Sequence, residues 1–445
     1  MNTTAPVSLE SYRDALVQGQ PQPGDFNQPW LAEQRREAVA SLQQLGFPQR
    51  RHEAWRYTSV DRLLQQDFVP AGAGLPEIRP DAFLLPQLDA HRVVLVNGRF
   101  AAGLSSLDAL PAGVTVGSLK QQIERNPIVP AKWIGRAAGA PRHVFSAMNT
   151  AAIDDGLVIH LAEGQRLERP IEVLHLTTAP TDAVMAQSRS LLLLEAGAQA
   201  TLIERYASQD SAAYFTNSLS EIFLQDDAGL EHIRQQDESA SAFHMHSLFI
   251  NQYAHSRYRN IAFALGSAWS RSELNIDFLG AGASAELDGL YVTGDQQLTD
   301  THIDIRHSVP GCQSHTNYKG LLHGKGRAVF DGRIEVKSHA GKSDAHLHNA
   351  NLLLSRNAEV DTKPQLEIHA DDVKCSHGTT VGQLDPAQLF YLRSRGIDTG
   401  EARRLLCLGF AAEILERCRF TPLREHVMDA VSARLTRAAS AAEQE

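Results

Sequence analysis

The chain lacks long apolar segments, clustered cysteines and any excess of positive charge. No apolar run reaches the roughly 20 residues that a membrane-spanning helix requires. The four cysteines, Cys312, Cys375, Cys407 and Cys418, form no CxxC pair, which argues against a disulfide framework and a four-cysteine zinc site. The 42 basic and 52 acidic residues give a formal net charge of −10, so the composition does not indicate a nucleic-acid-binding protein.

Sequence motifs of common enzymes are also missing. The segment closest to a phosphate-binding loop, GLLHGKGR, has the wrong spacing and no Ser or Thr after its lysine. There is no GxSxG, no HExxH and no GxGxxG that opens a helix. The first residues, MNTTAPVSLESYRDALVQGQ, contain no basic segment followed by an apolar one, so we expect no secretory signal and a cytoplasmic location.

The stretch from about residue 90 to residue 384 contains many short strand-like runs. Examples are RVVLVNG, GLVIHLAEG and ELNIDFLGAGASAELDGLYV, which are rich in Val, Ile, Leu and Thr and are separated by Gly-containing turns. Because we find no helical periodicity between them, a doubly wound α/β fold is excluded. A sandwich, a barrel and a β-solenoid remain, and a solenoid accommodates this length in one domain most readily.

The N-terminal region, residues 1–85, has a helical pattern. In FNQPWLAEQRREAVASLQQLGFP, Asn27 is expected to cap a helix and Pro29 to occupy its first turn. Apolar residues then recur at helical spacing until a Gly and a Pro end the segment. The sequence therefore predicts a helical domain before the strand-rich core.

Residues 385–445 return to a helical pattern. Asp385 is expected to cap a first helix, and Asp398 and Glu401 have capping-box spacing before a second one. The expected organisation is an N-terminal helical domain, a β core at 86–384 and a C-terminal helical domain.

Histidine is concentrated late in the core, since nine of the 19 fall between residues 302 and 377. Residues two apart on a strand share a face, so DAHLHN pairs His346 with His348. If the strand is regular throughout, HADDVKCSH would align five residues on one face: His369, Asp371, Val373, Cys375 and His377. A bulge or a solenoid corner would break that register.

The pair formed by Cys375 and His377 has two interpretations. Thiolate and imidazole are ligands suited to iron, copper or zinc, and a nearby protonated His would lower the pKa of the thiol. Equally, buried cysteines and hydrogen-bonded strand histidines are common without any such role. A Cys–His hydrolase has no evident oxyanion-hole element or orienting third group here. Spacing alone leaves a functional and a structural pair both open.

Residues 362–397, TKPQLEIHADDVKCSHGTTVGQLDPAQLFYLRSRGI, closely resemble the SufB/SufD family of SUF-system iron–sulfur cluster assembly proteins. EARRLLCLGFAAEIL, FSAMNTAAIDDGLVIHLAEG and GFPQRRHEAWRYT extend the resemblance over nearly the whole chain. DDVKCSHG is similar to the SufD-like version, whereas SufB-like sequences carry a Glu-His-Glu-type strand. The resemblance implies a right-handed parallel β-helix core flanked by N-terminal and C-terminal helical domains.

The resemblance also implies a function. Such a chain is a non-catalytic scaffold subunit that pairs with SufB and with the ATPase SufC, from which ATP hydrolysis is expected. The motif matches His377 to a histidine at the SufB contact, where it would be a metal or cluster ligand shared with SufB, and makes Cys375 the neighbouring thiol. His339, His346 and His348 are expected nearby on adjacent coils.

The C-terminal helices are implied as the SufC docking element. Five residues carry this expectation: Leu389, Tyr391, Arg393, Arg395 and Glu401. The iron–sulfur cluster would be transient at the SufB interface, a reduced flavin is associated with the complex, and no cofactor is expected to bind tightly to this chain alone.

The isolated chain is expected to form a homodimer through its exposed β-helix edge. Two alternatives remain: a purely structural partner subunit without a ligand role, and a β-helix enzyme acting on polysaccharide. For the enzyme we find no convincing set of carboxylates and Arg or Lys residues on one strand face.

Overall fold

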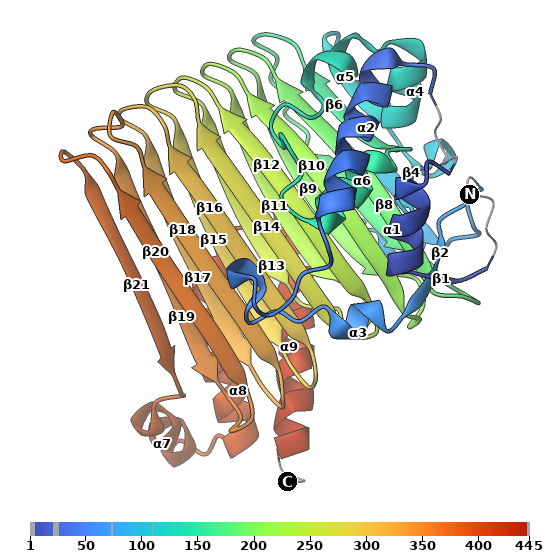
Figure 1. The fold of residues 1–445 in the computed structure, drawn as a ribbon. Helices are drawn as coiled ribbons and strands as arrows, with labels where there is room; N and C mark the ends of the chain where they lie inside the picture. Colours follow the sequence, from blue (N-terminus) through green and yellow to red (C-terminus); the bar gives the residue numbers. More distant parts are fainter. Residues whose placement is uncertain (1–4, 21–25, 73, 109, 443–445) are drawn as a thin grey trace.

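The computed structural model describes residues 5–20, 26–72, 74–108 and 110–442. Its centre is a parallel β-solenoid with two facing sheets (Figure 1). From β7 onward each strand pairs in parallel with the strand two positions later, so consecutive strands alternate between the sheets. The solenoid expected from the sequence is confirmed. Its last coil is formed by the strands nearest the C-terminal helices.

The first sheet has 11 strands. Its solenoid strands are β6 (Gly156–Leu161), β8 (Val184–Leu194), β10 (Tyr214–Leu224), β12 (Phe243–Gln252), β14 (Trp269–Phe278), β16 (Leu298–His307), β18 (Arg327–Val336) and β20 (Glu359–Ile368). Short strands β1 (Val7–Ser8), β2 (Asp67–Pro70) and β5 (Val114–Ser118) complete it.

The second sheet has 10 strands. They are β3 (His91–Val96), β4 (Arg99–Phe100), β7 (Ile171–Thr177), β9 (Gln199–Ser208), β11 (Gly229–Asp237), β13 (Arg257–Ala264), β15 (Ser284–Thr293), β17 (Gln313–Leu322), β19 (Asp344–Leu353) and β21 (Lys374–Gly382). β20 and β21 are therefore the last strands of the two sheets.

Side chains stack in register inside the solenoid. One column of the first sheet is made of isoleucines on successive coils and ends in a leucine: Ile222, Ile250, Ile276, Ile305, Ile334 and Leu366. The five isoleucines are buried in the core between the sheets. Because the number of residues between successive members of the column varies, the sequence shows only a loose repeat. Apolar stacking thus stabilises a coil whose loops differ in length.

The N-terminal helices lie on the outer face of the first sheet (Figure 1). They are α1 (Leu9–Val17), α2 (Pro29–Gln44), the single turn η1 (Glu53–Trp55) and α3 (Asp61–Leu64). Pro29 is the first residue of α2, as expected, but the preceding cap residue is Gln28 and its side chain makes no capping bond. The expectation that Asn27 caps this helix is wrong, since the helix begins one residue later.

Three further helices interrupt the region predicted to contain only strands. They are α4 (Leu119–Arg125), α5 (Ile128–Trp133) and α6 (Val144–Ala151), and two 3-10 turns, η2 (Pro80–Phe83) and η3 (Ala102–Leu104), lie nearby. The expectation of strands without helices from residue 90 to 384 is wrong for this part. Seven of the eight residues of α6 are buried, and its polar residues Ser146 and Asn149 hydrogen-bond inside the protein, so the sequence of this short helix does not show a solvent-exposed face.

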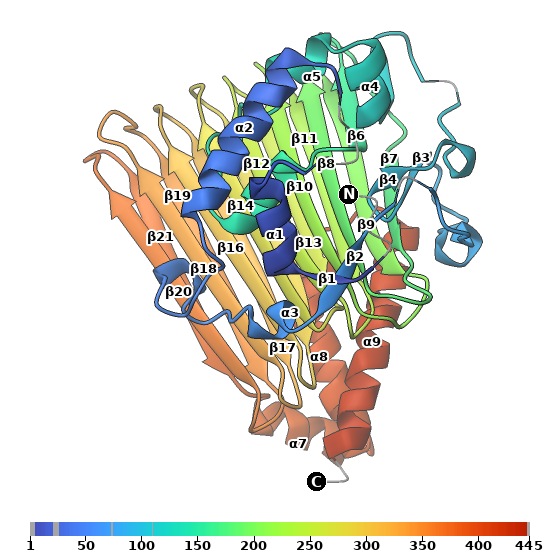
Figure 2. The same ribbon diagram turned by 45° about the vertical axis from the view of Figure 1, so that its right-hand side comes forward.

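The C-terminal helices are α7 (Pro386–Ser394), α8 (Thr399–Leu415) and α9 (Thr421–Ala442). Helices α8 and α9 cover the outer face of the second sheet, on the far side of the solenoid from α1 and α2 (Figure 2). The predicted caps are confirmed: the carboxylate of Asp385 accepts the Ala387 N–H, and that of Asp398 accepts the Glu401 N–H. No helix within the described ranges is long and apolar enough to cross a lipid bilayer.

Candidate functional site: the open end of the solenoid

The last coil of the solenoid has no following coil. Strand β20 pairs only with β18, and β21 pairs only with β19, within the part of the chain that the structure describes. Figure 1 shows β21 at the outer edge of the molecule, away from the N-terminal helices. Each of these two edge strands therefore has backbone N–H and C=O groups that can pair with another chain.

Cys375 and His377 both point toward the interior of this terminal coil. In the register of β19 and β21, Cys375 lies opposite Ala345 and His377 lies opposite Leu347, and both partners are buried. Because no coil lies above them, the Cys375 side chain is only half-buried and His377 is exposed. An imidazole and a thiol thus lie on the same strand face at the open end.

The Cys375 thiol is not activated in the isolated chain. Burial raises its pKa, and the nearby carboxylate of Asp344 raises it further, while a backbone hydrogen bond from Ala345 opposes the shift. A protonated histidine would have lowered this pKa, but none is among the groups that shift it. The protonated thiol is therefore the resting form, and the exposed imidazole of His377 is the more available of the two ligands.

The other residues of the expected strand face lie around a corner. Strand β20 ends at Ile368 and β21 begins at Lys374, so His369, Asp371 and Val373 belong to the turn between the two sheets. The expectation of one face from His369 to His377 is wrong because a solenoid corner interrupts the strand.

The neighbouring histidines face away from His377. His346 and His348 are on β19, next to β21, but they lie opposite Ser376 and Gly378, so strand alternation directs them to the outer face. His339 lies in the exposed turn between β18 and β19. These three histidines are thus close to the terminal coil, as expected, but they lie on a different surface from His377.

On that outer face His346 is held by its neighbours. Its Nδ1 lies 2.5 Å from the Ser376 Oγ and its Nε2 lies 2.7 Å from the Asp344 Oδ1. Its ring stacks on His315, with ring centroids 5.2 Å apart. His346 thus stabilises the pairing of the last two strands of the second sheet, a role that needs no ligand.

One group within the described residues has the spacing of a metal site: Glu335, Glu367 and His369. The sequence analysis missed it, because it joins Glu335 of β18 to Glu367 of β20 and to His369 in the corner that follows β20. Both carboxylates already have cationic partners: Arg333 donates two bonds to Glu367, at 2.8 and 2.7 Å, and Lys337 pairs with Glu335. These contacts lower the pKa of both carboxyl groups, so the group is an ion-pair network as it stands.

Helix α7 begins four residues after β21 ends and has no buried residue. The aromatic rings of Phe390 and Tyr391 are 73% and 57% exposed. The sequence analysis did not single out Phe390. Neighbouring residues of a helix project in different directions, so Phe390 and Tyr391 necessarily point to two sides of this short helix. Helix α7 thus exposes both of its aromatic side chains, which are available to a partner.

The residues expected to dock SufC are spread over two helices. Arg393 and Arg395 are exposed near the end of α7, and the Arg395 guanidinium lies 5.3 Å from the centroid of the Tyr391 ring. Leu389 is half-buried on the side of α7 that faces the solenoid. Glu401 accepts two hydrogen bonds from Arg404, at 2.7 and 2.6 Å, so α8 satisfies its charge internally.

The fold and the open end of the solenoid define a class of protein: a β-solenoid whose terminal coil is not covered by a further coil and carries a cysteine and a histidine. Two family models match the chain. One, described as SUF system FeS cluster assembly, SufBD core domain, covers residues 175–410, and the SufBD protein N-terminal region covers residues 11–173. The chain belongs to the SufBD family of iron–sulfur cluster assembly proteins.

Curated relatives agree with the family models. The iron-sulfur cluster assembly protein SufD of Escherichia coli is 34% identical over 410 residues, which cover 90% of this chain and 92% of the relative. An iron-sulfur cluster assembly SufBD family protein of Synechocystis sp. is 34% identical over 91% of both chains. The chloroplastic protein ABCI7 of Arabidopsis thaliana is 28% identical over 90% of this chain and 85% of its own length. The chain is thus SufD-like over most of its length.

Proposed function

We propose that this chain is a non-catalytic scaffold subunit on which iron–sulfur clusters are assembled. It pairs with SufB through the open edges of β20 and β21, and with the ATPase SufC through α7 and α8. The observation that carries the proposal is the exposed imidazole of His377 on the inner face of an unpaired terminal strand. Such a residue is buried only when a second chain covers it.

The ligands available here suit a shared site. An iron–sulfur cluster is held by about four ligands, and this face offers one imidazole and one thiol, so a partner must supply the others. The exposed imidazole of His377 is accessible to a metal ion, and the Cys375 thiol must lose the proton that its raised pKa retains before it can coordinate. An incomplete ligand set also favours release of the cluster, which is the cargo of the scaffold and not a resident cofactor.

The docking of SufC on α7 is supported by the exposed aromatic rings of that helix. Protein interfaces concentrate their binding energy in Trp, Tyr and Arg side chains. Tyr391 and Arg395 already contact each other, so little conformational entropy is lost when a partner orders them. The ATP hydrolysis that drives assembly is assigned to SufC.

We place the assembly in the cytoplasm, where thiols stay reduced, and the four cysteines of this chain are all free. A reduced flavin is proposed to act on the complex and not to bind this chain alone. Titration of the isolated chain with reduced flavin under anaerobic conditions is expected to give no saturable binding.

The test compares two histidine variants in cells that produce the chain together with SufB and SufC. His377→Ala is expected to retain both partners on co-purification and to lose the visible absorbance of the cluster after anaerobic reconstitution. His348→Ala is the matched control, since it removes an exposed imidazole from the adjacent strand but on the outer face. It is expected to behave like the wild type.

Two results would overturn the proposal at different levels. If His377→Ala assembles clusters as well as the wild type, His377 is not a ligand and the chain is a purely structural partner. If the wild-type chain retains neither SufB nor SufC, the scaffold function itself is wrong.

A further inference from the structure

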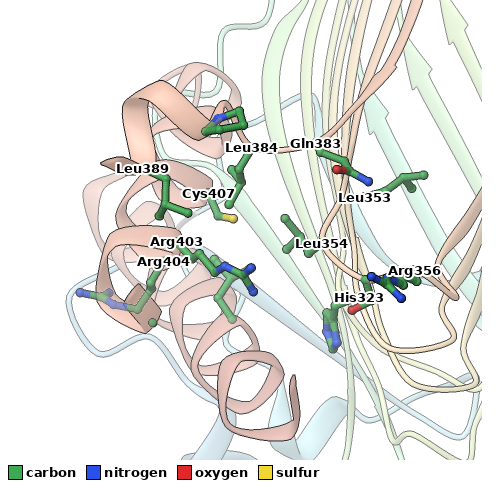
Figure 3. Close-up of a pocket in the computed structure, with 14 residues that line it drawn as sticks. His323, Leu353, Leu354, Arg356, Gln383, Leu384, Leu389, Arg403, Arg404 and Cys407 are labelled. Carbon is green, nitrogen blue, oxygen red and sulfur yellow. The ribbon is translucent and has the colours of Figure 1, made fainter. Parts of the chain in front are cut away.

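A pocket opens where the last coils of the second sheet meet the C-terminal helices (Figure 3). Its volume is about 370 Å³. One wall is made by the segments that follow β17, β19 and β21, and the other by α7, α8 and α9. This volume lies in the range of about 300–1,000 Å³ that is typical of small-molecule sites.

The walls of the pocket are largely apolar. Leucines contribute from both sides: Leu353, Leu354, Leu384, Leu389 and Leu435. The Cys407 side chain also lines the pocket, and burial raises the pKa of its thiol to about 12, so it acts as a neutral apolar group. An occupant therefore meets a hydrocarbon surface over most of its body.

The polar side chains of the pocket are basic. Arg356 and Arg403 are exposed, and within the described residues neither guanidinium makes a hydrogen bond or an ion pair. Figure 3 shows the Arg403 side chain directed toward the strand ends that carry His323 and Arg356, whereas Arg404 is directed away from them. Arg404 is already paired with Glu401.

Among the described residues, no carboxylate lines this pocket, although the chain has a net charge of −10. Each of the four other pockets described includes at least one Asp or Glu. Two unpaired guanidinium groups thus lie beside an apolar cavity whose described lining contains no carboxylate.

We propose that this pocket binds a small anion with an apolar body. Its carboxylate or phosphate would lie between Arg356 and Arg403, and its hydrocarbon or aromatic part against the leucines. Guanidinium groups suit this role because their planar set of N–H donors matches the oxygens of carboxylate and phosphate. The pocket lies away from the open end of the solenoid but shares Leu389 of α7 and part of α8 with the surface proposed to bind SufC; because the chain alone is tested, the outcome does not depend on the scaffold function.

Occupation of the pocket would link three separate elements. Arg356 follows β19, Arg403 belongs to α8, and Leu389 belongs to α7, whose own side chains bury nothing. A ligand that contacts all three would hold α7 against the end of the solenoid. The expected result is reduced backbone hydrogen exchange in α7 and in residues 353–356 when the ligand is bound.

The test uses the full-length chain and four probes. The amphipathic probes are kept below their critical micelle concentrations. Decanoate represents an aliphatic carboxylate and 1-naphthyl phosphate an aromatic phosphate, while decanol lacks the charge and inorganic phosphate lacks the apolar body. By calorimetric titration, at least one amphipathic anion is expected to bind ten times more tightly than both controls. Which of the two binds distinguishes an acyl ligand from an aromatic phosphate.

Variants locate the site. The double variant Arg356→Ala/Arg403→Ala is expected to bind the preferred anion at least tenfold more weakly. Arg257→Ala is the matched control, because Arg257 is also exposed and without an ion pair in the described residues but lies on β13, outside the pocket. Its affinity for the anion is expected to equal that of the wild type.

The proposal is wrong if neither anion binds more tightly than decanol and inorganic phosphate, or if the double variant binds as well as the wild type. If the double variant does not fold, hydrogen exchange of the wild-type chain decides. Ligand-dependent protection only in segments that do not line the pocket, outside α7, α8, α9, residue 323, residues 353–356 and residues 383–386, would then refute the assignment.

Discussion

His307, the last residue of β16, offers a quantitative test of how the buried polar groups of the solenoid limit its stability in acid. Its side chain is fully buried, its Nε2 lies 2.9 Å from the Ser314 Oγ, and its ring meets Phe278 edge-on with centroids 4.7 Å apart. Its Nδ1 has no hydrogen-bond partner among the described residues. Burial lowers the pKa of this histidine from 6.5 to about 4.

The direction of the effect follows from proton binding. As the pH falls below about 6.5, the unfolded chain takes up a proton at this histidine, while the folded chain stays neutral until about pH 4. The unfolded state therefore binds more protons within this window, and the free energy of unfolding decreases as the pH falls. For these two pKa values the loss at pH 5 is about 2 kcal/mol, and at pH 8 it is close to zero.

The assay compares guanidinium unfolding of the wild type and His307→Gln at pH 8 and pH 5. Whatever the stability of the variant at pH 8, the wild type is expected to lose about 2 kcal/mol more than the variant between the two pH values. All other titrating groups cancel in this double difference. The exposed His348→Gln serves as control and should follow the wild type. Equal losses in the wild type and His307→Gln would refute the burial argument.

Three more predictions concern stability and association. Glu221→Ala is expected to lower the free energy of unfolding in urea by about 3–5 kcal/mol. The carboxylate accepts three backbone N–H bonds from residues 135–138, and its removal leaves Arg189 buried without its charge partner. Glu221→Gln should cost less, and an equal cost would contradict the role of charge. Phe390→Ala should weaken SufC co-purification at least tenfold without moving the thermal midpoint; unchanged retention would exclude α7 from the interface. The isolated chain should elute as a dimer in gel filtration at micromolar concentration and as a heterodimer after SufB is added, whereas a monomer at all concentrations would contradict pairing through the open edges.

Features that depend on a few neighbouring residues were predictable. The caps at Asp385 and Asp398 form as expected because each carboxylate bonds a backbone N–H two or three residues away. The strand-rich core was recognised from its apolar runs and Gly turns. Helix α6 was missed because it has only eight residues and seven of them are buried, so it has no solvent-exposed face to mark it in the sequence.

In the candidate site, too, only the features that depend on neighbouring residues of one strand were predictable. Alternation along one strand is enough to place Cys375 and His377 on the same face, and the family resemblance pointed to His377. The sequence could not show that His369 and Asp371 lie around a corner, because the position of a corner depends on the coil below. Nor could it show that His346 and His348 face outward, since the register between β19 and β21 is a contact between distant parts of the chain.

The sequence by itself therefore determined the fold class, the family and the pair of residues at the centre of the candidate site. Only the tertiary structure decided that this pair lies at an open end, because exposure depends on which coil comes last and on what covers it. It alone brought Arg356 and Arg403 to one pocket. Residues so far apart in the chain meet only when the solenoid and the C-terminal helices have packed, and nothing local in either segment specifies that contact.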